Sequence, residues 1–214
     1  MTIMSSFYGD AAIVPYTTKT ISNMRTELRH SEAKEGDLAE TIAYFDELRK
    51  DDPEFFYKIK YDAFDRVENV FWVDGNACKA YAEAYHDCIS FDTTYLTNMY
   101  NMPFAPFIGI NRHGQSFMLG CGFLRQEVAT SFDWIFMVFL EAMNGKAPLN
   151  IITDQDGSMK KSIADIFPGT VHRCCRWHIM KKAQEKLGAF LGRRPELAKD
   201  FNECVDSSMT PDEF

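Results

Sequence analysis

Two stretches decide the fold that this sequence predicts: Ser90-Phe91-Asp92-Thr93-Thr94-Tyr95 and Ile151-Ile152-Thr153-Asp154-Gln155-Asp156. In each of them a short apolar run ends in an aspartate, and such runs are typical of buried strands. In an open α/β sheet, a carboxylate at the carboxyl end of a strand points into the crevice where ligands bind. Because Asp92 and Asp154 lie far apart in the chain, only the fold can bring them together.

The segments around these stretches predict a mixed sheet with helices. From residue 88 onward, hydrophobic periodicity and turn residues predict, in order, strands over 88–92, 104–110 and 116–124, a helix over 130–143, a strand over 149–153, a helix over 156–166, a strand over 169–172 and a helix over 175–191. Thr130-Ser131-Phe132-Asp133 fits a capping box, and Asp156 is a helix-cap candidate. This order is that of an α/β, ribonuclease-H-like sheet, in which the first and fourth strands are neighbours.

The chain divides into four predicted segments. Residues 1–36 are expected to be poorly ordered, with a short helix near Asn23 to His30, and residues 37–85 form a lead-in of a helix, a β-hairpin and a second helix. The ribonuclease-H-like core is expected over 86–192, incomplete because it stops before a last catalytic helix. Residues 193–214 are expected to begin a helical insertion or a tail.

Composition excludes several classes of protein. The 214 residues are 46% hydrophobic, enough for one folded domain plus an appendage rather than a disordered tail. No run approaches the ~20 apolar residues that span a bilayer, and the amino terminus lacks the pattern of a secretory signal. The six cysteines show no disulfide spacing, so reduced thiols in the cytosol or nucleus are expected.

Charge is unevenly distributed along the chain. The net charge is −8, which argues against a simple basic nucleic-acid binder. From Glu32 to Glu68 there are twelve acids and six bases, whereas from His172 to Arg194 there are seven bases and one acid. The basic stretch is either a solvated helix face or a surface that contacts phosphates. Its candidate DNA-binding residues are Arg173, Arg176, Lys181, Lys182 and Lys186.

Asp92 and Asp154 are candidate catalytic residues and Mg²⁺ ligands. On neighbouring strands they would be close enough to bridge two Mg²⁺ ions, about 3.5–4 Å apart, as in two-metal phosphoryl transfer. That chemistry needs several carboxylates, and the sequence identifies no third one. The alternative is that either aspartate is only a cap or turn residue, the role expected of Asp156.

Cys175-Arg176-Trp177-His178 has a spacing that could place a thiolate and an imidazole on one zinc ion. A closed zinc site needs four ligands, and His172 and Cys174 nearby do not form a second paired motif. The alternatives are a packed cysteine beside a hydrogen-bonded histidine, or a Cys-His protease dyad, for which no oxyanion loop or orienting partner is visible.

Several motifs together resemble the Mutator-like element (MULE) transposase domain, and more narrowly the plant far-red-impaired-response and far-red-elongated-hypocotyl family. The similarity runs from about Asp37 to Lys186. The similar segments are 52–57, 69–74, 91–98, 103–111, 113–115, 151–156 and 172–178. By this resemblance Asp92 and Asp154 correspond to the first two acids of a transposase triad, and Cys175 and His178 to its C-x₂-H signature. The third acid, a glutamate, is expected beyond Phe214.

The resemblance implies a nuclear, transposase-derived regulator of transcription whose core is a scaffold for DNA or for other proteins, including transcription regulators and family members in homo- or heterodimers. Relatives usually add an amino-terminal zinc-chelating DNA-binding domain and a carboxy-terminal SWIM-type zinc motif, neither of which is in this sequence. The alternatives are a DNA transposase core that cleaves and joins DNA with two metals, and a pure dimerisation module.

Overall fold

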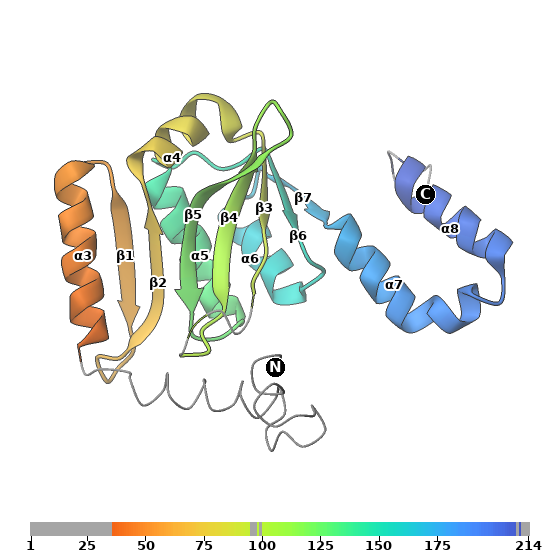
Figure 1. Ribbon diagram of the computed structural model, residues 1–214, viewed down its shortest axis with the longest axis horizontal. Helices are drawn as coiled ribbons and strands as arrows, with labels where there is room; N and C mark the ends of the chain where they lie inside the picture. Colours follow the sequence, from red (N-terminus) through yellow and green to blue (C-terminus); the bar gives the residue numbers. More distant parts are fainter. Residues whose placement is uncertain (1–35, 95–97, 99, 209, 211–214) are drawn as a thin grey trace, which may run out of the picture.

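The computed structural model describes residues 36–94, 98, 100–208 and 210. The predictions for residues 1–35 and for the end of the chain from 211 lie outside these residues. The described chain is a mixed α/β fold built on one seven-stranded sheet with strand order β1-β2-β5-β4-β3-β6-β7 (Figure 1). Among the described residues, no helix has both the length and the apolar character needed to cross a bilayer.

The lead-in forms as predicted, with a helix before a hairpin. Its elements are α3 (Asp37–Asp51), β1 (Phe56–Tyr61) and β2 (Val67–Val73). The two strands are antiparallel, and the Asp62 carboxylate closes their turn by accepting hydrogen bonds from the amides of Phe64 and Arg66. Phe45 of α3 packs against Phe55 and Val70 in a small cluster of buried residues. This cluster lies on one face of the sheet.

The middle of the sheet changes from antiparallel to parallel pairing. Its strands are β3 (Cys88–Phe91), β4 (Phe104–Ile110), β5 (Ser116–Leu124), β6 (Asn150–Thr153) and β7 (Val171–Cys174). The chain meanders antiparallel through β3, β4 and β5, whereas β6 pairs parallel with both β3 and β7. The first and fourth strands of the core are therefore neighbours, as the element order predicted. The last strand lies two residues later than the predicted range 169–172.

The helices of the core begin with different caps. They are α4 (Gly75–Ala80), which continues into the π-helical turn η2 (Tyr81–Tyr85), α5 (Ala129–Ala142) and α6 (Gly157–Ile166). Asp156 caps α6 as predicted, since its carboxylate accepts the amide of Met159 at 2.8 Å. The predicted capping box at Thr130 is wrong. The N-cap of α5 is Val128, which makes no side-chain cap bond, because burial of Ser131 and Phe132 sets the start of this helix.

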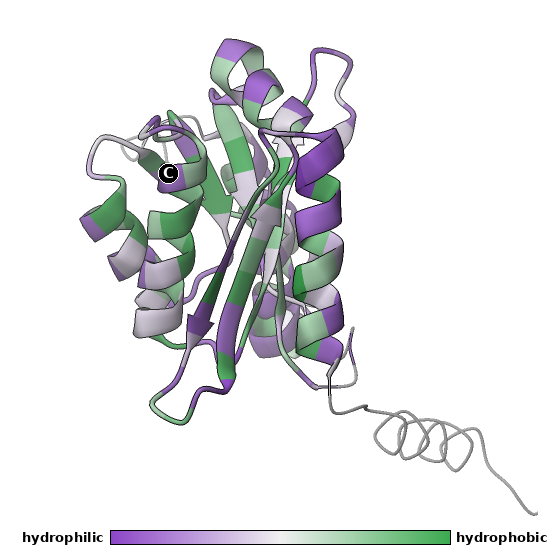
Figure 2. Ribbon diagram, turned by 90° about the vertical axis from the view of Figure 1, so that its left-hand side faces the viewer, coloured by the Kyte–Doolittle hydropathy of each residue, from purple (hydrophilic) through white to green (hydrophobic). Residues whose placement is uncertain are grey.

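Phenylalanines form the main core between the sheet and α5. Phe107 of β4 stacks on Phe139 of α5 with ring centroids 4.1 Å apart, and Phe71 of β2 meets Phe139 edge-on. Because side chains alternate across a strand, Phe71 faces α5 whereas Val70 faces α3. Helices thus cover both faces of the sheet, and Figure 2 shows it between them, with hydrophobic residues along the strands.

Two further helices extend away from the sheet at its β7 edge (Figure 1). They are α7 (Arg176–Leu191) and α8 (Pro195–Ser207), and neither contains a buried residue. The predicted end of α7 at Gly192 is confirmed, since Gly192 is its C-cap. Residues 195–207, which the sequence assigned only to the start of an insertion or tail, form a regular helix.

Candidate functional site at the carboxyl ends of β3 and β6

Parallel pairing of β3 and β6 positions the two aspartates. Ser90 of β3 is in register with Ile152 of β6, and Asp92 and Asp154 each lie two residues further along. Both therefore leave the sheet at the same edge, which in an open α/β sheet is the edge where ligands bind. The negative charge of Asp154 contributes to raising the pKa of Asp92, so the two carboxylates interact electrostatically.

Asp92 is a half-exposed carboxylate with several polar neighbours. Partial burial is the main cause that raises its pKa, and His178 opposes this shift. The Asp92 Oδ1 atom accepts the Thr93 amide at 2.9 Å, and Oδ2 lies 3.5 Å from Nε2 of His178. Folding thus holds Asp92 where its charged form is disfavoured by lost hydration.

Asp154 is fixed by the turn that leads into α6. Its Oδ1 accepts the Asp156 amide at 3.0 Å, and its Oδ2 lies 4.0 Å from Nζ of Lys182. The preceding residue, Thr153, is buried; its hydroxyl donates to the Asp154 carbonyl at 2.8 Å and lies 2.7 Å from Nε2 of His172. Burial, and next the charge of Lys160, lower the pKa of His172, which favours a neutral imidazole beside the site.

Helix α7 brings two nitrogen groups to the two acids. His178 and Lys182 are four residues apart, so they project from the same side of the helix. They approach Asp92 and Asp154, respectively. Nδ1 of His178 is buried and has no hydrogen-bond partner among the described residues. In the sequence analysis, zinc was one alternative for His178, and Lys182 was a candidate DNA contact; the structure places both near the carboxylates.

Glu127 is a member of this site that the sequence reasoning missed. It lies between β5 and α5, accepts a short hydrogen bond from the Thr93 hydroxyl, and its charge also raises the pKa of Asp92. The strand directions were the available signal. Because β4 runs opposite to both β3 and β5, the carboxyl ends of β3 and β5 share one edge. A residue shortly after β5 is therefore placed near Asp92.

The described side chains do not assemble a metal site in this arrangement. Asp92 and Asp154 offer the oxygen ligands that Mg²⁺ prefers, but no group of three His, Cys, Asp or Glu residues within the described ranges is placed to hold a metal ion. The residues as placed do not fit the two-metal arrangement. Zinc binding by Cys175 and His178 stays a prediction, and the described residues supply no closed set of four ligands for it.

The basic residues of α7 have different surroundings. Arg176 is paired with Asp206 of α8, with a second contact of 2.8 Å between Nη2 and Oδ2. Lys181 lies over the ring of Trp177, with Nζ 5.1 Å from the centroid. Arg173 and Lys186 are exposed. Part of the basic stretch is therefore neutralised within the chain, and the rest faces solvent or the site.

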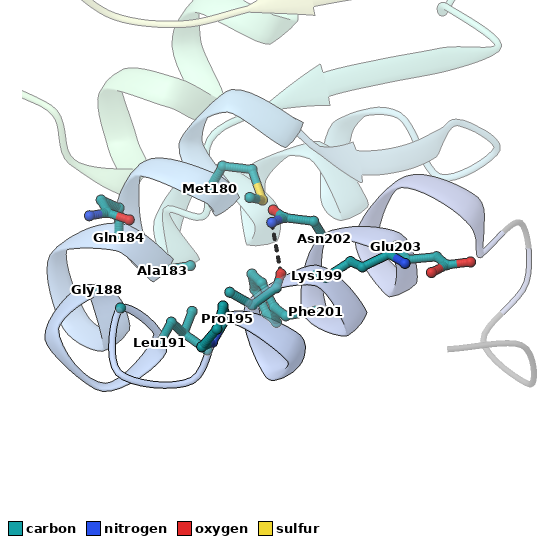
Figure 3. Close-up of a pocket in the computed structure, with 12 residues that line it drawn as sticks. Met180, Ala183, Gln184, Gly188, Leu191, Pro195, Lys199, Phe201, Asn202 and Glu203 are labelled. Atoms are coloured by element: carbon teal, nitrogen blue, oxygen red, sulfur yellow. Dashed lines mark hydrogen bonds between the residues drawn. The ribbon is translucent and has the colours of Figure 1, made fainter.

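A separate hollow of about 720 Å³ lies between α7 and α8. Figure 3 shows that Met180 and Ala183 from α7 and Phe201 from α8 line it. None of the three acids of the site contributes to its wall. The hollow therefore belongs to the outer side of α7, and the acids lie on the other side of this helix.

Comparison with known proteins gives the following similarities. The family model described as MULE transposase domain matches residues 88–182. The chain is 36% identical to Protein FAR1-RELATED SEQUENCE 5 of Arabidopsis thaliana over 214 residues, which is 100% of this chain and 27% of the relative. It is 34% identical to Protein FAR-RED IMPAIRED RESPONSE 1 of the same plant over 194 residues, 91% of this chain and 23% of the relative. The chain thus spans about a quarter of these relatives.

Proposed function

Residues 88–182 belong to the MULE transposase domain family, and from this premise we propose that the chain is part of a transposase-derived nuclear protein that regulates transcription. In this proposal the core has the ribonuclease-H-like layout and is a scaffold for DNA or for other proteins, including family members. The similarity to plant FAR1-related proteins, which covers most of this chain, supports such a domesticated origin. Parallel pairing of β3 with β6 supports the layout.

One observation carries the choice of a scaffold over an enzyme: α7 directs a nitrogen group at each of the two aspartates. His178 lies 3.5 Å from Asp92 and Lys182 lies 4.0 Å from Asp154. A lysine ammonium supplies positive charge to a carboxylate pair without bringing any ligand for a metal. The same basic helix also offers Lys181 and Lys186 to phosphates. The site therefore suits association more directly than bond cleavage.

A second candidate function is a Mutator-like DNA transposase core. The observation that favours it is the convergence of β3, β5 and β6, whose following residues Asp92, Glu127 and Asp154 share one edge of the sheet. This function would need metal ligands in addition to Asp92 and Asp154, since the described residues as placed do not form a metal site. The protein's own contribution would be His178 and Lys182, which orient these acids, while Lys182 also supplies positive charge beside Asp154.

Binding and cleavage assays on the same DNA separate the two functions. The chain is mixed with a labelled duplex in Mg²⁺ or Mn²⁺, and both binding at increasing salt and the appearance of nicked product are measured. A scaffold binds with salt-dependent affinity and leaves the duplex intact. The variants are Asp92→Asn and Asp154→Asn, and Asp165→Asn on the exposed side of α6 is the matched control. Cleavage that is lost in the first two variants and kept in the control would overturn the scaffold.

A further inference from the structure

Trp177 is a large aromatic side chain that the structure leaves open to solvent at the edge of the site. This residue is 61% exposed, although it directly precedes His178, which approaches Asp92. The indole and imidazole rings are nearly perpendicular, with centroids 4.7 Å apart. An exposed tryptophan beside polar side chains is a common element of binding surfaces, because its flat face is apolar and rigid.

The position of Trp177 around α7 explains why neither neighbour covers it. By helical periodicity, one side of α7 faces α8 through Met180, Ala183 and Leu191, and another side faces the acids through His178 and Lys182. Trp177 and Lys181 are four residues apart on one stripe of α7, and both are exposed at the amino-terminal end of the helix. This end of the stripe is therefore open to a ligand that also lies beside the acids.

Charge on this stripe favours an anionic ligand with flat apolar groups. Lys181 lies over the indole ring and is itself exposed to solvent. Arg176 is excluded from this set, because Asp206 pairs with it. Asp92 and Asp154 repel phosphates from their own surroundings, so a nucleic-acid backbone is best placed along α7, with its bases directed to the indole.

We propose, on the basis of the DNA association proposed above, that Trp177 and Lys181 form a stacking platform for an unpaired base of DNA. In this arrangement the base lies on the exposed face of Trp177 while Lys181 contacts the adjacent phosphate. Stacking on aromatic side chains needs an exposed base face, which a continuous duplex does not offer. The site thus distinguishes DNA with unpaired bases from intact duplex.

The chain offers two matched controls for this platform. Phe190, at the other end of α7, is 49% exposed and has the Arg194 guanidinium 4.1 Å from its ring centroid. Phe64, in the acidic lead-in, is 77% exposed, and the Arg66 guanidinium lies 5.2 Å from its ring centroid. Both pairs combine an exposed ring with a cation. Neither ring directly precedes a residue that contacts the acids. The controls therefore show whether DNA binding depends on the position of Trp177 beside the acids or only on the presence of an exposed ring next to a cation.

The test measures affinities for three labelled oligonucleotides of one sequence in low salt: a single strand, a blunt duplex and a duplex with an unpaired bulge. Trp177→Ala is expected to weaken binding of the single strand and the bulged duplex by roughly 5- to 150-fold and to leave binding of the blunt duplex nearly unchanged. Trp177→Phe keeps a stacking ring and should restore most of the affinity. Phe190→Ala and Phe64→Ala should bind like the parent chain. Circular dichroism of each variant checks that the fold is kept.

The outcomes separate this platform from the broader DNA association. If Trp177→Ala binds all three oligonucleotides like the parent chain, while replacing Lys181 and Lys186 by Ala weakens all three, the platform is refuted and DNA association stands. An equal loss in Trp177→Ala and Phe190→Ala also refutes the platform. If the parent chain binds none of the oligonucleotides, both proposals fail, and a loss of self-association in Trp177→Ala would then assign this surface to protein contact instead.

Discussion

Phe91 connects the core to the candidate site, so its truncation is the most informative perturbation of the fold. The side chain is fully buried, directly precedes Asp92, and packs with ring centroids 4.7 Å from Phe107 and 4.9 Å from Phe136. Truncation of a buried phenylalanine to alanine costs about 3–5 kcal/mol. We expect Phe91→Ala to lie in the upper half of this range, since aromatic pairs contribute beyond buried area. For a chain of this size the melting temperature falls by roughly 2–4 °C per kcal/mol.

Urea unfolding followed by circular dichroism measures this effect as a change in the free energy of unfolding. Phe64→Ala is the matched control, because Phe64 is 77% exposed and its truncation should cost little. Phe91→Leu conserves most of the volume and should cost less than about 1.5 kcal/mol. A loss below about 1.5 kcal/mol for Phe91→Ala, or a loss equal to that of the control, would refute the packing described for this end of β3.

Three further perturbations test single contacts. Asp156→Ala removes the cap that accepts the Met159 amide at 2.8 Å, and urea unfolding should show a loss of about 1 kcal/mol in the free energy of unfolding. Asp156→Asn keeps a capping oxygen and should therefore lose much less. Gly122→Ala would place a Cβ atom 2.4 Å from the Val70 carbonyl oxygen. Because the backbone must move to relieve this contact, thermal unfolding should show a loss of about 1–3 kcal/mol in stability. An unchanged melting temperature would contradict the close approach of β2 and β5. Burial raises the pKa of Asp92, so the folded state disfavours the carboxylate and Asp92→Asn should stabilise the chain at neutral pH. The sign follows from linkage: below the pKa of Asp92 in the unfolded chain the carboxyl group is protonated in both states, so its charge costs nothing. The cost develops as the pH rises through the pKa of Asp92 in the folded chain. A gain in stability of Asp92→Asn that persists at pH 3 would therefore contradict this explanation.

Local patterns were sufficient to predict most elements of the core. Apolar runs ending at Phe91 and Thr153 became β3 and β6, because buried strands need continuous apolar residues. Asp156 was identified as a cap from its position before a helical period, and this contact formed. The capping box at Thr130 failed for the opposite reason. There, packing of Phe132 into the core outweighed the local hydrogen-bonding preference of the preceding threonine.

The candidate site was predicted only in part. Asp92 and Asp154 were identified because each follows a strand, which is a local property. Glu127 was missed, since no local pattern marks it and its closeness to Thr93 depends on the direction of β5. The pairings of His178 with Asp92 and of Lys182 with Asp154 were also missed. They depend on the orientation of α7, which is set by the β7 strand that precedes it.

Local patterns in the chain were enough to predict most strands and helices of the core, and that aspartates follow two of the strands, because periodicity and caps act between residues close in the chain. What surrounds these aspartates depends instead on the three-dimensional packing. The pKa of Asp92 depends on burial and on His178, and the exposure of Trp177 depends on how α7 lies between α8 and the sheet. These properties arise from Coulomb interactions and excluded water over a few ångströms of space, which separation along the chain does not encode.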